Sequence, residues 1–114
     1  MLPKSKRLNL KKDFKWVASG KKLETKYLKI YVKYGQSTQA KVGIAVSSKT
    51  FKKATARNKA KRLVSSAFES AYSQLPTNIS IVAIPKPGIL DVKSSDALLD
   101  LEEILKKEYE RNID

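Results

Sequence analysis

The sequence predicts an α+β sandwich, in which helices pack on a small mixed sheet. Residues 26–34 alternate between apolar and polar side chains, which is typical of a strand with one buried face. Residues 54–74 repeat small apolar side chains at helical spacing, so one stripe of this helix should lie on the sheet. Residues 79–84 are continuously apolar, as expected of a strand buried on both faces. A chain of 114 residues fits one domain, residues 1–114.

The first element after the N-terminus is a predicted helix over residues 10–19. Residues 1–8 are basic, and we expect them to form a tail that is flexible unless it is bound. Asn9 can accept a hydrogen bond as the N-cap of the helix, and Gly20 suits its end. Phe14 and Trp16 are two positions apart and therefore cannot both point at the same core.

Two strands follow, over residues 26–34 and 40–48, and we predict that they run antiparallel across a turn at residues 35–39. The inner face of the first strand is apolar. Its outer face is a row of rings and cations: Tyr27, Lys29, Tyr31 and Lys33. Such a row can stack on bases and attract phosphates of single-stranded nucleic acid. It is equally consistent with an ordinary solvated strand face.

The second half of the chain contains the long central helix, the buried strand and a last helix. Pro76 ends the central helix. Ser94 or Ser95 can cap the last helix, which should extend to about Arg111. This last helix is acidic on its outside, and we expect its role to be structural. The predicted order is helix, strand, strand, helix, strand, helix.

Charge is divided unevenly along the chain. Residues 1–62 contain 19 Lys and Arg against two acidic residues, whereas residues 63–114 have a net charge of −4 within an overall +13. This asymmetry indicates a basic face presented to nucleic acid or to another anionic surface. A basic protein without such a partner is the alternative.

The densest cations open the central helix. Arg57, Asn58, Lys59, Lys61 and Arg62 follow a loop that contains Lys49, Lys52 and Lys53. The N-terminal end of a helix is already positive, so cations there are unfavourable by a few tenths of a kcal/mol each, roughly. A bound polyanion reverses this sign, because the helix end and the cations then attract the same phosphates. The pattern therefore favours a surface that binds a polyanion.

Several chemistries are excluded by composition. The chain has no histidine and no cysteine, so it lacks an imidazole base, disulfides and thiolate metal ligands. Its basic half has only Asp13 and Glu24, too few carboxylates for a two-metal nuclease. No apolar run approaches the roughly 20 residues of a membrane span, and no secretory signal is apparent. We expect a cytoplasmic protein that is not catalytic alone and takes no small-molecule substrate.

The run Arg57-Asn58-Lys59-x-Lys61-Arg62 resembles the hallmark of the protein component of bacterial ribonuclease P. Supporting residues extend over nearly the whole chain: Arg7-Leu8, Lys12-Asp13-Phe14, Val42-Gly43-Ile44-Ala45-Val46-Ser47 and Pro85-Lys86-Pro87. The chain departs from the family's pattern in the loop at residues 49–53. It also departs at Ala60, where a branched aliphatic residue is usual, and at Ser65, where a further basic residue is usual.

This resemblance implies a sandwich with a left-handed strand–helix–strand crossover, against the usual right-handed rule. It implies that a large RNA is the catalyst, using magnesium ions held mainly by that RNA, and that the protein binds none. The partners would be the ribonuclease P RNA and precursor tRNA, whose 5′ leader is removed. The RNA-binding residues would be Lys49, Lys53, Arg57, Asn58, Lys59, Lys61 and Arg62. The leader cleft would be formed by Phe14, Tyr27, Lys29 and Tyr31.

Two other classes of protein remain as alternatives. A small basic ribosomal protein would share the composition and the class of fold. A stand-alone nuclease would cleave RNA without an RNA partner.

Overall fold

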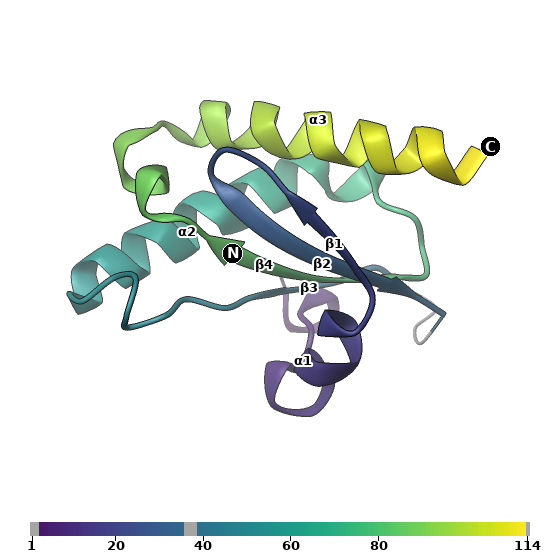
Figure 1. Ribbon diagram of the computed structural model, residues 1–114, viewed down its shortest axis with the longest axis horizontal. Helices are drawn as coiled ribbons and strands as arrows, with labels where there is room; N and C mark the ends of the chain where they lie inside the picture. The colour runs from purple at the N-terminus through teal and green to yellow at the C-terminus, as the bar shows by residue number, and fades with distance from the viewer. Residues whose placement is uncertain (1–2, 36–38, 114) are drawn as a thin grey trace.

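A four-stranded sheet separates one helix from two others in this computed structural model, which describes residues 3–35 and 39–113, without the side chains of Lys4, Ser94 and residues 108–113 (Figure 1). The strands are β1 (Lys21–Glu24), β2 (Leu28–Tyr34), β3 (Lys41–Ile44) and β4 (Ile79–Pro85). The helices are α1 (Leu10–Ala18), α2 (Ala54–Ala71) and α3 (Ser94–Ile113). Short 3-10 turns are η1 (Lys4–Lys6), η2 (Tyr72–Gln74) and η3 (Pro87–Asp91). The predicted α+β class is confirmed.

The strand order is β1-β2-β4-β3. The strands predicted at residues 26–34 and 40–48, which correspond to β2 and β3, run antiparallel as predicted, but they are not neighbours as a simple hairpin would require. β4 lies between β2 and β3, antiparallel to β2 and parallel to β3. β4 is the most apolar strand, and six of its seven residues are buried. A strand that is apolar on both faces gains most from a central position. β3 and β4 are joined through α2 as a β–α–β unit, and the left-handed crossover stays a prediction from the resemblance.

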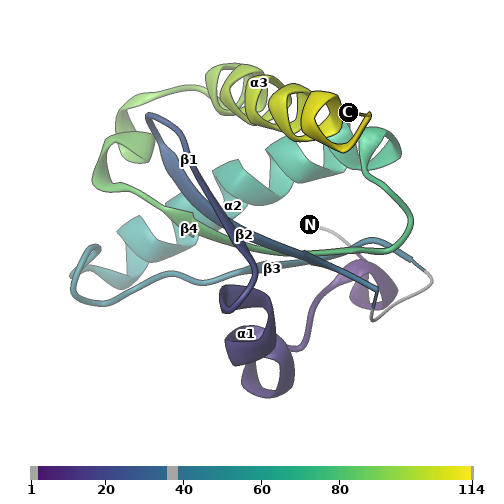
Figure 2. The same ribbon diagram turned by 45° about the vertical axis from the view of Figure 1, so that its right-hand side comes forward.

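The two faces of the sheet carry separate apolar clusters, and α2 and α3 cover one of them (Figure 2). Leu28, Ile30 and Val32 point from β2 into this larger cluster and are at most 1% exposed. α1 covers the other face, where Val17 packs with Leu8 and Val82. The alternation predicted for residues 26–34 is therefore confirmed from Leu28 to Val32, whose apolar side chains lie on the face covered by α2 and α3. However, the opposite face is not simply solvated, because α1 lies on it.

β1 is a strand that the sequence analysis missed. Of its four residues only Leu23 is buried, so the sequence has no alternating apolar pattern that would predict this strand. The strand forms because Lys21–Glu24 pairs with residues 29–32 of β2 in a hairpin. Pairing with an established strand, rather than local preference, determines this element.

Part of the segment expected to be a free tail lies against the sheet. The Leu8 N–H donates to the carbonyl oxygen of Val42 at 3.1 Å, and Arg7 forms an isolated parallel bridge with Val42. Leu8 is 7% exposed. The apolar side chain explains the attachment, since burying it against the sheet is favourable. Within the described residues, no helix is both long and apolar enough to span a bilayer.

Candidate nucleic-acid interface

The basic surface begins in the loop that leads from β3 into α2. Lys49 and Lys53 are both exposed, and Lys53 occupies the N-cap position of α2 without a capping hydrogen bond from its side chain. The first turn of α2 contains no acidic residue. The positive end of the helix is therefore left uncompensated by its own first turn, which favours an anion there.

The side chain of Arg57 is held in place by hydrogen bonds to two backbone carbonyl oxygens of the preceding loop. Its Nη1 donates to the carbonyl oxygens of Phe51 at 2.9 Å and Lys52 at 3.1 Å. Phe51 is 3% exposed and anchors the loop in the core. Arg57 therefore fixes the path of the loop, and its half-buried guanidinium holds Lys52 and Lys53 near the start of α2.

Lys61 and Asn58 face β3 and α1. Together with Arg57 they line a hollow of about 410 Å³ whose other wall is apolar: Leu10, Ile44, Ala45 and Val46. Arg62 lies further round the helix, where it shares a second hollow with Thr55, Asn58 and Lys61. Asn58, Lys61 and Arg62 are exposed.

Lys59 points to the opposite flank of α2. Its Nζ donates to the carbonyl oxygen of Leu90 in η3 at 3.1 Å. The motif therefore divides, with Lys59 on one flank and Asn58, Lys61 and Arg62 on the other. Within the described part of the chain, none of the motif's four cations forms an ion pair with a carboxylate. Their charge is available to a partner.

The structure brings three of the four predicted leader-binding residues to the α1 face of the sheet. Phe14 and Tyr31 are half-buried and pack against the same apolar cluster, formed by Leu8, Val17 and Val82. Lys29 shares their side of β2, because it is two residues from Tyr31 and pairs with Ile84 of β4. We call Phe14, Lys29 and Tyr31 the aromatic shelf.

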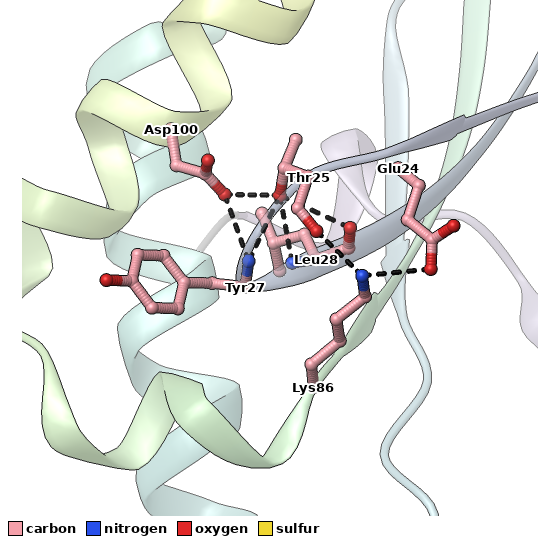
Figure 3. A network of polar contacts seen from close by, with 6 residues as sticks. All are labelled: Glu24, Thr25, Tyr27, Leu28, Lys86 and Asp100. Carbon is pink, nitrogen blue, oxygen red and sulfur yellow. Dashed lines mark hydrogen bonds and ion pairs between the residues drawn. The ribbon is translucent and has the colours of Figure 1, made fainter.

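Tyr27 is not part of this shelf, which corrects the predicted alternation from residue 26. It packs against the larger cluster, on the side of α2 and α3. The reason is the tight turn before β2, in which Thr25 Oγ1 accepts the N–H groups of Tyr27 and Leu28 at 3.3 and 2.9 Å (Figure 3). The regular alternation begins only at Leu28, once the chain has left that turn.

The same turn is fastened to α3 and to the end of β4 (Figure 3). Thr25 Oγ1 donates to Asp100 of α3, and Lys86 Nζ donates to the carbonyl oxygen of Thr25 at 2.7 Å. Lys86 also forms an ion pair with Glu24 at 2.9 Å. The hydrogen bond and charge of Lys86 lower the pKa of Glu24 below its ordinary value of 4.5. Lys86, which follows β4 in the basic Pro-Lys-Pro segment, is therefore engaged within the protein.

A wall of apolar residues joins the shelf to the cations of α2, and the sequence analysis did not assign it to the site. Ala45 and Leu10 contact the shelf's cluster and also line the hollow below Arg57 and Lys61. Gly43 is the sequence feature that could have indicated this wall, since a glycine inside a strand often marks the close approach of another segment. A Cβ at Gly43 would lie 2.6 Å from Leu10 Cδ2, so α1 packs directly on this backbone.

Together these features define a small α+β protein that presents aromatic rings and unpaired cations on one connected surface, as proteins that bind single-stranded nucleic acid do.

The comparisons with known proteins agree on one family. A family model described as Ribonuclease P matches residues 2–109. The ribonuclease P protein component of Pseudoalteromonas atlantica is 34% identical over 80 residues, which span 70% of this chain and 66% of that protein. The component from a Pseudanabaena species is 36% identical over 84 residues, 72% of each chain.

Solved structures give the same result. The RNase P protein from Thermotoga maritima superposes with a TM-score of 0.78 at 30% identity, covering 89% of this chain and 96% of that one. The Staphylococcus aureus RNase P protein, at 24% identity and a TM-score of 0.77, supports the fold; the match covers 92% of this chain and 96% of that one. The chain belongs to the ribonuclease P protein family. The predicted family and the predicted role as protein component of ribonuclease P are confirmed at this level.

Proposed function

We propose that this protein assists a catalytic RNA in removing the 5′ leader of precursor tRNA. The observation that carries the proposal is the connection between two surfaces. Cations at the start of α2 that have no carboxylate partner among the described residues adjoin the aromatic shelf through the wall formed by Leu10 and Ala45. One strand of RNA can therefore meet phosphate-binding and base-stacking groups along the same path.

The two surfaces have different tasks in this proposal. Lys49, Lys53 and the motif of α2 contact phosphates of the catalytic RNA and of the substrate. The shelf receives the single-stranded leader, and Phe14 and Tyr31 stack on bases at about 1–3 kcal/mol each. Lys29 attracts the intervening phosphate. Tyr27 lies outside this path because it packs against the other cluster.

The contribution to the reaction is differential binding and charge neutralisation. Two RNA molecules repel each other, and cations placed between them lower the free energy of their approach. Magnesium ions held by the RNA would supply the attacking and leaving oxygens with charge stabilisation. This protein's own residues bind and orient the leader. The cytoplasmic compartment and the RNA-bound magnesium stay predictions.

The test is reconstitution. Purified protein is mixed with a bacterial ribonuclease P RNA and precursor tRNA at low magnesium, and the 5′ cut is measured. Restored cleavage supports the proposal, and no restoration rejects it. Tyr31→Ala should weaken binding of leader-bearing substrate more than binding of leaderless tRNA, whereas Tyr27→Ala should not discriminate between them. Equal losses of affinity for both substrates in Tyr31→Ala would contradict the proposal that the aromatic shelf binds the leader.

A further inference from the structure

At the outer edge of β3, the backbone of Ile44 has no hydrogen-bond partner among the residues that the structure describes. Leu8 bonds to the carbonyl oxygen of Val42, so the N-terminal segment covers the edge only up to that residue. The Ala45 N–H donates to Ala83 of β4 at 2.9 Å, which shows that Ala45 faces the sheet. Because successive residues face opposite sides, the Ile44 N–H and C=O point outward. Nothing within residues 3–35 and 39–113 accepts a hydrogen bond from this N–H.

A hollow of about 310 Å³ lies at this edge, between the start of α1 and the flank of α2. Its walls are mainly apolar, and Lys11 and Lys61 stand at its rim. The apolar part is formed by Leu8, Leu10, Val42 and Ile44. Its size is at the lower end of the range for ligand sites, about 300–1,000 Å³. The hollow therefore suits one small planar group.

We propose that this hollow receives a single unstacked nucleobase of single-stranded RNA. The apolar walls cover the faces of the ring, and the outward N–H and C=O of Ile44 form hydrogen bonds with its edge. Lys61 holds the adjoining phosphate. A base offers both donors and acceptors on its edge, which matches a backbone pair of this kind. This inference rests on the proposed function, since it places one base of the bound strand.

A peptide strand fits this edge less well than a base. Strand addition needs several successive unpaired residues. Here the N-terminal segment already occupies the edge at Val42, and β3 ends at Ile44. The rim of lysines also favours an occupant that carries phosphate.

Ser65 keeps the hollow open in this chain. It lines the hollow from α2 and is 3% exposed, at the position where the resemblance predicts a larger basic residue. A longer side chain at residue 65 would occupy part of the space. Ser66 is the next residue of the same helix, is exposed, and does not line the hollow, so it provides a matched control.

The first experiment follows the Ile44 amide by NMR in the full ¹⁵N-labelled chain. We expect its signal to shift on titration with nucleoside 5′-monophosphates and not with ribose 5-phosphate, which lacks the base. Ser65→Leu should abolish the shift, and Ser66→Leu should keep it. An equal shift with ribose 5-phosphate would reduce the site to a phosphate site. A response to a short acidic peptide but not to nucleotides would assign the edge to strand addition. Either result overturns the proposal.

The second experiment uses the unaltered protein with its RNA partner, so it does not depend on the folding of a variant. Precursor tRNAs are prepared with one abasic site at each leader position in turn. We expect one position to lose about tenfold in affinity, the equivalent of one bound base, beyond the loss at its neighbours. A uniform loss along the leader overturns the base site while leaving the proposed function intact. Absence of any protein-dependent cleavage would instead reject the function.

Discussion

The guanidinium of Arg57 donates a hydrogen bond to the carbonyl oxygen of Phe51 at 2.9 Å, six residues earlier in the chain. Because Phe51 is buried, this bond fastens the basic loop to both the core and the start of α2. The first cation of the motif therefore shapes the basic surface as well as adding charge to it. Arg62 carries charge but does not fasten the loop, since it is exposed and lines only the hollow that it shares with Thr55, Asn58 and Lys61.

Arg57→Ala should lower the free energy of unfolding by about 1–2 kcal/mol, because two hydrogen bonds from a charged donor are lost. Arg62→Ala should change it by less than about 0.5 kcal/mol, as at other exposed sites. Both variants should weaken binding of RNA. Urea denaturation measures the stabilities, and equal stability losses would show that the Arg57 bonds contribute nothing.

Lys61→Ala should reduce the salt dependence of RNA binding. Each phosphate contact contributes about −0.7 to the slope of log K against log salt for a single strand, so removing one cation should make the slope shallower by about that amount. Lys107→Ala on α3, where Lys107 lies 3.8 Å from Glu103, is the control and should leave the slope unchanged. A slope near zero for the unaltered protein would contradict an electrostatic interface.

Glu24→Gln should destabilise the protein near pH 7 and have little effect in acid. The pKa of Glu24 is lowered in the folded state by the hydrogen bond and charge of Lys86, so its contribution is present above the unfolded value of 4.5. That contribution is lost as the pH falls through the folded pKa. Thermal unfolding of both proteins between pH 3 and pH 7, roughly the range in which a carboxyl group titrates, measures the difference. A difference independent of pH would show that the ion pair is not its source.

Thr25→Val should destabilise the attachment of α3 to the β1–β2 turn. The substitution keeps the shape of the side chain but removes the hydroxyl that donates to Asp100 and accepts from Tyr27 and Leu28. The Tyr27 N–H also donates to Asp100 at 3.4 Å, so the substitution removes the Thr25 partner of Asp100 and of the Leu28 N–H. Loss of a partner by a partly buried polar group costs about 1–3 kcal/mol. Thr77→Val, at an exposed turn, is the control for the residue type. Similar melting temperatures for the two variants would contradict a role for this network.

Gly43→Ala should displace the Leu10 side chain that packs α1 on the sheet, because the new Cβ would lie 2.6 Å from Leu10 Cδ2 and 3.1 Å from Leu10 Cγ. Overpacking of this kind costs about 1–3 kcal/mol. The cost should shrink in a Leu10→Ala background, where the conflicting atoms are absent. A double-mutant cycle by chemical denaturation measures this coupling, and additive effects would place the conflict elsewhere.

Local patterns predicted most elements of this fold. The small-residue stripe of residues 54–74 and the apolar run of residues 79–84 correspond to α2 and β4, and Asn9 caps α1 by accepting from the Lys12 N–H at 3.3 Å. These elements could be read because their burial repeats at a regular period. The cations of α2 could be predicted for a different reason: they are concentrated in one short stretch that contains no acidic residue.

Other features were not readable from local patterns. β1 has one buried residue, and Tyr27 leaves the alternation because of a hydroxyl two residues before it. The hollow at the edge of β3 combines residues from the N-terminal segment, β3 and α2. No stretch of sequence contains that combination.

The sequence by itself determined the class of fold and the concentration of cations at the start of the central helix, because periodicity and charge density are properties of neighbouring residues. Only the tertiary structure decided that β4 lies between β2 and β3, that Lys59 turns away from Lys61 toward η3, and that Phe14 of α1 and Tyr31 of β2 pack against the same apolar cluster. These outcomes depend on which distant surfaces bury each other, and that choice is made by the packing of the whole chain.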